Sequence, residues 1–195
     1  MTQVDNTKRR LLVVATSAVG GIGMAGAAAP FVASMFPSER AKAAGAPVEA
    51  DIGNLAPGAL RIVEWRGKPV WILRRTEAML ADIRADDALV SDPRSEVPQQ
   101  PDYARNEFRS IKPDIAVLVG VCTHLGCSPQ FKSADDKAEM GQAWSGGFYC
   151  PCHGSKFDLA GRVLKGSPAP TNLVVPPYEF VGTDKIIIGA DTRKA

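Results

Sequence analysis

The cysteine and histidine residues of this chain are concentrated in one short segment. Its 195 residues include four cysteines and two histidines, and all six lie between Cys122 and His153. Thiolates and imidazoles are the side chains that bind transition metals such as iron and zinc. Chance would rarely cluster them in this way. The pattern therefore indicates a metal or redox site, not a scaffold held together throughout by disulfides.

The six residues form two motifs of matching composition. The first is CTHLGC from Cys122 to Cys127, and the second is CPCHGS from Cys150 to Ser155. Together they offer six potential ligands, which is more than the four of a tetrahedral zinc site. The ratio of cysteine to histidine also differs from that of an all-cysteine iron–sulfur cluster.

One division of the six residues uses all of them, with two cysteines on one iron, two histidines on another, and the remaining cysteines in a disulfide. The pairs are Cys122 with Cys150, His124 with His153, and Cys127 with Cys152. Two cysteines and two histidines are the ligand pattern of a Rieske 2Fe–2S centre. The bridge would tie the two motifs together, and it is consistent with a location outside the cytoplasm.

Other interpretations of the motifs stay open at this point. A structural zinc ion fits the same two cysteines and two histidines as ligands. A disulfide oxidoreductase is disfavoured because Cys150 and Cys152 are separated by one residue and no βαβ pattern surrounds them. A lone cysteine nucleophile would not account for two motifs of matching composition.

The N-terminal part predicts a single transmembrane anchor. Residues 11–36 contain no charged side chain, and as a helix they would span about 39 Å, enough to cross a hydrocarbon core of about 30 Å. Basic residues at positions 8–10 precede this stretch. They predict that residues 1–10 remain in the cytoplasm and that the rest of the chain lies outside, in the periplasm.

The same segment has features of an export signal. Arg9 and Arg10 are followed by two leucines, which is typical of a twin-arginine signal for proteins exported in the folded state. Ala44-Gly45-Ala46 has the small residues of a cleavage site. The apolar stretch is, however, much longer than the core of about 7–15 residues in a cleaved signal peptide. We therefore expect it to be retained.

The remainder predicts a hinge and a mainly β head. Residues 37–47 are small, polar and bracketed by prolines, which is typical of a flexible linker. In the head, residues 48–195, Thr76 could cap a short helix, and the polar stretch 85–110 predicts a long surface excursion. The tryptophans are expected in the core or at its rim. The predicted strands are residues 60–65, 70–73, 115–119, 148–149, 173–175, 178–181 and 185–188.

Composition excludes several classes of protein. The net charge is +2 and charged residues make up 23% of the chain. These values give neither the basic excess of a nucleic-acid-binding protein nor the composition of a disordered one. A collagen-like or multi-pass membrane protein is excluded as well.

The chain as a whole resembles the Rieske iron–sulfur subunits of bacterial cytochrome bc complexes, the ubiquinol–cytochrome c reductases. The two motifs carry the resemblance, together with the basic N-terminus, the single anchor and the small-residue hinge. Residues 158–162 (DLAGR), residues 165–170 (KGSPAP) and residues 175–178 (VPPY) match family features too. Compared with the family pattern, Ser167 is one extra residue before Pro-Ala-Pro.

The resemblance implies a fold, a cofactor and a set of partners. The expected fold is an antiparallel Rieske-type β-sandwich with a cluster-binding subdomain whose loops lie at about residues 120–170. It implies one 2Fe–2S cluster in a subunit of the bacterial inner membrane, within a dimeric complex that also holds cytochrome b and a c-type cytochrome. In the family, quinol gives an electron to the cluster, protons are released, and the mobile head passes the electron to the c-type cytochrome. No nucleic-acid partner is expected.

The resemblance also assigns roles around the cluster. It gives His153 the hydrogen bond from quinol and the acceptance of its proton, with His124 exposed nearby. It makes Ser155 a hydrogen-bond donor to a cluster sulfur. Many members have a tyrosine at the position of Phe157, so the missing hydroxyl predicts a lower reduction potential. Leu125, Gly126 and Pro168 are expected to surround the cluster, with residues 168–170 covering it from a third side.

Two related classes are alternatives to this interpretation. The Rieske subunit of another exported oxidase, such as arsenite oxidase, would share the signal and the cluster but would not need a retained anchor or a mobile hinge. Rieske ferredoxins and oxygenase domains typically lack the additional cysteine pair, so Cys127 and Cys152 argue against them.

Overall fold

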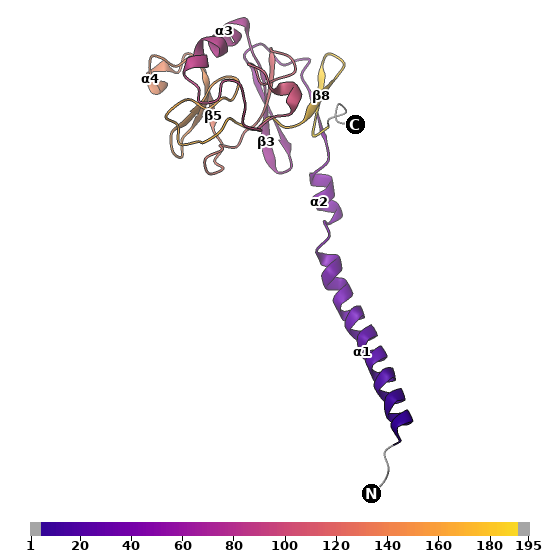
Figure 1. The fold of residues 1–195 in the computed structure, drawn as a ribbon. Coiled ribbons are helices and arrows are strands. Elements are labelled where there is room, and N and C mark those ends of the chain that lie inside the picture. Colours follow the sequence, from indigo (N-terminus) through magenta and orange to yellow (C-terminus); the bar gives the residue numbers. More distant parts are fainter. Residues whose placement is uncertain (1–4, 191–195) are drawn as a thin grey trace. The chain divides into compact units, whose positions relative to one another are not determined.

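The structure, a computed structural model, describes residues 5–190 of the chain (Figure 1). It consists of two compact units, Met1–Ala43 and Ala44–Ala195. The ends of the predicted N-terminal segment and of the predicted head, residues 1–4 and 191–195, lie outside the described residues.

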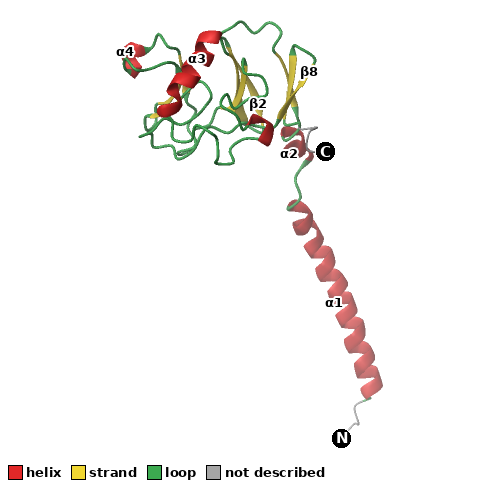
Figure 2. Cartoon of the chain, turned by 45° about the horizontal axis from the view of Figure 1, so that its top comes forward, coloured by secondary structure: helices red, strands yellow, loops and turns green. Residues whose placement is uncertain are grey.

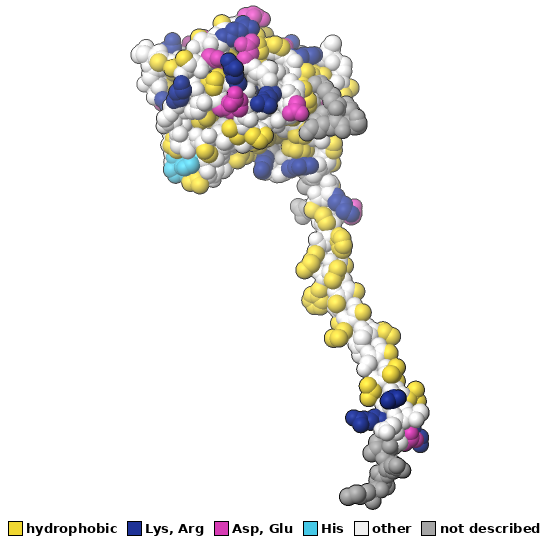
Figure 3. Space-filling view, in the orientation of Figure 1, with side chains coloured by type: hydrophobic (Ala, Val, Ile, Leu, Met, Phe, Trp, Pro, Cys, Tyr) yellow, Lys and Arg dark blue, Asp and Glu magenta, His cyan; other side chains and the backbone are white. Residues whose placement is uncertain are grey.

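The first unit is dominated by one long helix, α1 (Asn6–Ser34). Asp5 caps its start, because the carboxylate accepts hydrogen bonds from the backbone N–H groups of Thr7 and Lys8 at 3.0 and 3.2 Å. The helix is long and apolar enough to cross a membrane. Hydrophobic side chains are exposed along its length (Figure 3). An exposed apolar surface of this kind is expected of a membrane anchor.

A short helix, α2 (Glu39–Ala44), occupies part of the predicted hinge. The Ser38 hydroxyl accepts a hydrogen bond from the backbone N–H of Ala41 at 3.2 Å, and Lys42 pairs with Glu39 at 2.7 Å on the surface. A helix of six residues supported by one exposed ion pair is marginal in water. The hinge stays a prediction.

The described part of the head contains three antiparallel sheets (Figure 2). Their strand orders are β1-β9-β8, β2-β3-β4 and β5-β6-β7. Adjacent strands pair antiparallel; in β3 and β4, for example, Trp71 lies opposite Leu118. The strands are β1 (Val48–Asp51), β2 (Leu60–Trp65), β3 (Lys68–Arg74), β4 (Ile115–Val119), β5 (Gln130–Lys132), β6 (Gly147–Cys150), β7 (Ser155–Phe157), β8 (Tyr178–Val181) and β9 (Lys185–Ile188).

The first two sheets share one core, as in a β-sandwich. Ile186 and Ile188 of β9 belong to the same buried cluster as Val70 of β3. Trp65 packs so closely on Gly189 that a Cβ there would lie 2.5 Å from the indole nitrogen. The third sheet carries the second Cys/His motif, and its Phe148 and Phe157 belong to the same buried cluster. The predicted antiparallel head is therefore confirmed, and so is the burial of all three tryptophans.

The helices of the head are short. α3 (Glu77–Ala85) begins where predicted, since the Thr76 hydroxyl accepts a hydrogen bond from the backbone N–H of Met79 at 3.3 Å. Leu80 and Ile83 point into the core from this helix. The others are α4 (Lys137–Met140) and the 3-10 turns η1 (Asp86–Ala88) and η2 (Asp102–Ala104).

Two sequence-based expectations about the head are wrong. Residues 173–175 do not form a strand. The prolines at 176 and 177 have no N–H to donate to a neighbouring strand. Residues 173–175 make isolated backbone hydrogen bonds and no continuous ladder; for example, the N–H of Val119 donates to the carbonyl of Val174 at 2.8 Å. The stretch 85–110 is not simply a surface excursion, because Phe108 and Arg109 within it are buried.

Candidate metal centre

The first motif is a tight loop at the end of β4. All five residues of this strand are buried, so the strand fixes the start of the loop in the core. The backbone N–H of Cys122 donates to the carbonyl of Cys127 at 2.7 Å, and that of Gly126 donates to the carbonyl of Cys122 at 3.0 Å. Gly126 has a φ of +84°, which glycine adopts without strain. The loop thus closes on itself and presents His124 and Leu125 at its outer end.

The second motif is the turn of the β6–β7 hairpin. Cys150 and Ser155 are paired across the two strands, and the N–H of Gly154 donates to the carbonyl of Cys150 at 2.9 Å. This turn leaves His153 exposed, whereas Cys150 and Ser155 are buried. The hairpin therefore holds a cysteine inside and a histidine outside within four residues.

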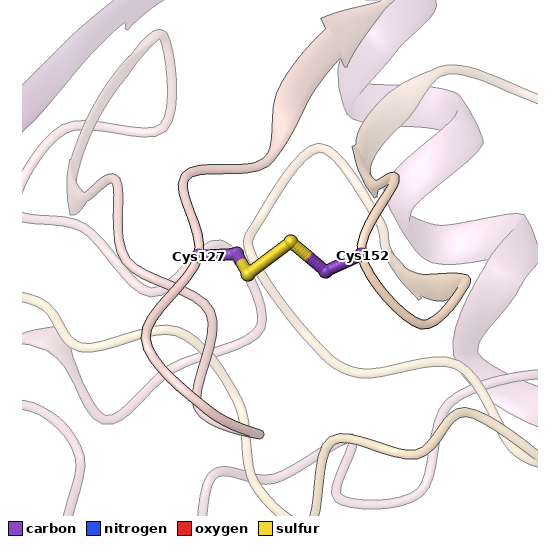
Figure 4. The surroundings of a disulfide bond; sticks show 2 residues. All are labelled: Cys127 and Cys152. Carbon is purple, nitrogen blue, oxygen red and sulfur yellow. A yellow bond between two sulfur atoms is a disulfide. The ribbon is translucent and has the colours of Figure 1, made fainter.

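A disulfide between Cys127 and Cys152 joins the two loops, as the sequence predicted (Figure 4). The two residues are separated by 25 positions in the sequence. Their Cα atoms are 6.7 Å apart, so the bridge holds the tips of both loops together.

The other two cysteines are free thiols buried behind the bridge. Burial raises the pKa of the Cys150 thiol, and the adjacent Cys122 thiol raises it further. Two adjacent buried thiols that no disulfide uses form a donor pair for a metal ion, which would bind them as thiolates.

The two histidines face each other across the loops. Their ring centroids are 4.8 Å apart and the rings are perpendicular. The Nδ1 atom of His124 is buried and has no hydrogen-bond partner. A buried imidazole nitrogen without a partner is costly unless it binds something, so this atom is a candidate metal ligand. The structure thus brings the predicted ligands together as a thiol pair and an imidazole pair.

A third loop, residues 166–171, connects to both motifs through hydroxyl groups. The Thr123 hydroxyl donates to the carbonyl of Thr171 at 2.6 Å, and the Ser155 hydroxyl accepts from the N–H of Ala169 at 3.1 Å. The extra residue Ser167 also has a structural role, because its hydroxyl accepts from the N–H of Lys156 at 3.1 Å. Sequence analysis missed Thr123, and the only available signal was its place inside the first motif.

The remaining predicted residues differ in exposure. Phe157 is completely buried in β7, Leu125 is 71% exposed at the outer end of the first loop, and Pro168 is exposed in the third loop. Gly126 is exposed as well. The outer surface around the imidazole pair is thus largely apolar, which suits contact with another molecule.

Buried arginines hold the polypeptide that follows the second motif. Arg162 pairs with Asp158 at 2.7 Å, and both side chains are buried. Arg109 donates to the carbonyls of Ala160 and Leu173 at 3.2 and 2.7 Å. Burial lowers the pKa of Arg109 only to about 10, so the side chain remains charged at neutral pH. Sequence analysis missed Arg109, which lies in a polar stretch with no motif around it.

Comparison with known proteins agrees with this geometry. Residues 95–179 match the Rieske 2Fe-2S domain, and residues 1–38 match the family described as "Ubiquitinol-cytochrome C reductase Fe-S subunit TAT signal". The ubiquinol-cytochrome c reductase iron-sulfur subunit of Allochromatium vinosum is 56% identical over 192 residues, which cover 98% of this chain and 93% of that protein. This chain belongs to the ubiquinol–cytochrome c reductase iron–sulfur subunit family.

Other members of the family align over a similar length. The subunit of the same name from Blastochloris viridis is 46% identical over 187 residues, covering 95% of this chain and 94% of that protein. A solved chain titled "Hyperthermophilic respiratory Complex III" is 30% identical, with a TM-score of 0.47, and the match covers 89% of this chain and 98% of that one.

Family membership defines the cofactor as a Rieske 2Fe–2S cluster. The donor set fits this group, because the two loops joined by the disulfide supply two buried thiols and two imidazoles, one of which has an unpartnered buried Nδ1 atom. A single tetrahedral zinc ion is therefore not the resident metal. The N-terminal match and helix α1 fit a membrane-anchored subunit of a cytochrome bc complex.

Proposed function

We propose that this chain is the electron-transfer subunit that takes an electron from quinol and passes it to a c-type cytochrome, with release of protons. The perpendicular pair of His124 and His153 is the observation that carries the proposal. It lies on the outside of two loops whose inner side holds the thiol pair. Family membership supports the same role.

The ligand assignment follows from the two donor pairs. We assign Cys122 and Cys150 to one iron and His124 and His153 to the other. One-electron oxidation and reduction is the chemistry that a bound 2Fe–2S cluster supplies, at a higher potential with two histidine ligands than with four cysteines. The thiols must lose their protons on binding iron, and the raised pKa of Cys150 means that loading at neutral pH releases a proton there.

The histidines differ in their access to a substrate. His153 is exposed and His124 is half-buried. With one ring nitrogen bound to iron, the other nitrogen of the exposed His153 would be free to accept a hydrogen bond from a quinol. We therefore assign His153 the hydrogen bond from quinol and the acceptance of its proton. The apolar surface at Leu125 and Pro168 would contact the quinol-binding subunit, cytochrome b.

The anchor sets the location of this chemistry. We propose that α1 spans the bacterial inner membrane once, with the basic residues Lys8, Arg9 and Arg10 on the cytoplasmic side. Residues 48–195 then lie in the periplasm, within a dimeric multi-subunit complex. Residues 37–47 would allow this head to move between quinol and the c-type cytochrome.

Purification of the intact complex tests this function. The chain is extracted from membranes in mild detergent, its cytochrome haems are assayed, and quinol-dependent reduction of the c-type haem is measured. We expect the chain to copurify with cytochrome b and cytochrome c and to support this reaction. A soluble periplasmic chain without haem-containing partners would contradict the proposal and favour the alternative class of exported oxidases.

A further inference from the structure

A cavity of about 330 Å³ lies next to the first ligand loop. Its size is within the range of small binding sites in proteins. Its wall includes Cys122, so anything that fills the cavity lies against a proposed cluster ligand. Thr123 of the first motif also lines the cavity, and the apolar part of the wall comes from β2, the end of β4, the residue before the motif and the segment before β8: Trp65, Val119, Val121 and Val174.

Two basic residues of the β2–β3 turn line the same cavity, Arg66 and Lys68. The turn is a two-residue loop, since Trp65 pairs with Lys68 and both Arg66 and Gly67 have positive φ values, 54° and 68°. The Arg66 guanidinium lies over the Trp65 ring, 4.5 Å from its centroid. The N–H of Gly120 donates to the carbonyl of Pro69 at 2.8 Å, which fastens the turn to the chain just before the first motif.

These two cations have no carboxylate partner among the described residues, although both are exposed. Two other lysines of the head are paired, Lys132 with Glu139 and Lys185 with Glu49, whereas Lys112, like Lys68, is not paired within the part of the chain that the structure describes. Unpaired cations beside an apolar cavity attract an anionic surface and orient it as it approaches.

We propose that this cationic cavity docks the electron-accepting partner, through an acidic segment that places an apolar side chain in the cavity. The inference rests on the proposed function. It goes further by assigning the docking chemistry to Arg66, Lys68 and the adjacent cavity. A protein acceptor is favoured over an anionic lipid because Cys122 forms part of the wall. An occupant here lies beside the cluster ligands, where electron transfer requires it.

Charge reversal in the intact complex tests the inference. Lys68→Glu reverses one cation, and Arg66→Asn removes the other with a residue that tolerates positive φ. Lys112→Glu is the matched control, because Lys112 is also an exposed cation, lies over the Phe180 ring and does not line the cavity. Electron transfer from the reduced cluster to the c-type haem is followed by rapid mixing at ionic strengths of about 0.01 M and about 0.15 M.

We expect Lys68→Glu to slow this transfer about tenfold at the lower ionic strength, and Arg66→Asn to slow it less. The difference from wild type should shrink at the higher ionic strength, because salt screens exposed charges. Lys112→Glu should stay close to wild type. Val174→Phe, which narrows the cavity, should slow transfer at both ionic strengths. The EPR spectrum and potential of the cluster should not change in any variant.

Equal rates in Lys68→Glu and Lys112→Glu would overturn the inference while the proposed function stands. An effect of Lys68→Glu that appears only when anionic phospholipid is added would assign the cavity to the membrane surface and would also overturn it. Failure of the wild-type complex to reduce the c-type haem would instead contradict the proposed function, and the docking inference would fail with it.

Discussion

The indole ring of Trp71 stacks on the phenyl ring of Phe148, with centroids 4.6 Å apart and planes 13° from parallel. Trp71 belongs to the sheet that leads into the first motif, and Phe148 belongs to the strand that leads into the second. The stack therefore joins the two substructures that carry the proposed ligands. Gly120 packs against the Trp71 ring of this stack. A Cβ atom added to Gly120 would lie 2.3 Å from that ring.

Gly120→Ala should therefore destabilise the head. Neither the backbone nor a ring stacked on Phe148 can move freely, and overpacking of a core costs about 1–3 kcal/mol. Urea denaturation of the full-length protein in detergent measures this loss. Trp71→Leu removes the indole ring that the new methyl group would meet, so the double variant should lose less stability than the two single variants added together. Strict additivity would contradict the proposed contact.

Removal of the disulfide should weaken retention of the cluster. A bridge that closes a segment of this length contributes about 3 kcal/mol in the loop-entropy model. In the double variant Cys127→Ser, Cys152→Ser, we expect a lower unfolding temperature and faster loss of iron. Wild-type protein treated with a thiol reductant serves as the comparison. Iron loss at the wild-type rate in the double variant would show that the third loop alone is sufficient to hold the two motifs together.

Phe157→Tyr should raise the reduction potential of the cluster. Phe157 and Ser155 lie two residues apart in β7, so their side chains point to the same buried side of the strand. A hydroxyl added there could donate to a ligand sulfur, which stabilises the more negative, reduced cluster. A potentiometric titration followed by EPR measures the change, and Phe157→Leu controls for altered packing. An unchanged or lowered potential in the tyrosine variant would count against this role.

Asp86→Asn should stabilise the head increasingly as the pH rises. Burial raises the pKa of the Asp86 carboxyl, and the hydrogen bond from the Ser145 hydroxyl only partly offsets this. The folded protein therefore binds this proton more tightly than the unfolded chain. This tighter binding contributes to the free energy of unfolding. The contribution is complete below the unfolded-state pKa of 3.8 and is lost as the pH rises through the folded-state pKa. Asparagine does not ionise, so it avoids the loss.

Urea denaturation between about pH 4 and about pH 8 measures this difference. The advantage of Asp86→Asn over wild type should grow with pH and then level off. If the difference in free energy of unfolding between the variant and wild type were constant across the pH range, the pKa of Asp86 would be the same in the folded and unfolded states.

The sequence predicted the regular elements of the head where hydrophobic runs and caps are local signals. Val117 in β4 and Thr76 before α3 are examples. It failed at 173–175, where an apolar run resembles a strand but the following prolines limit its pairing. It also failed at Arg109, because a polar residue can be buried when distant carbonyls satisfy it, and those partners are 51 to 64 residues away.

The candidate site was predicted more completely than the fold around it. The motifs alone predicted the thiol pair, the imidazole pair and the disulfide, because cysteine and histidine occur nowhere else in the chain. The supporting contacts could not be predicted. The hydrogen bond from Thr123 to Thr171 and the close packing of Gly120 on Trp71 both depend on the tertiary arrangement.

Pulsed EPR on protein labelled with ¹⁵N in the imidazole rings of histidine tests the assignment of His124 and His153 to iron. The chain contains no other histidine, so the label marks only the two proposed imidazole ligands. We expect strong couplings from two ¹⁵N nuclei in the reduced protein. Coupling from one nucleus, or from none, would contradict this assignment.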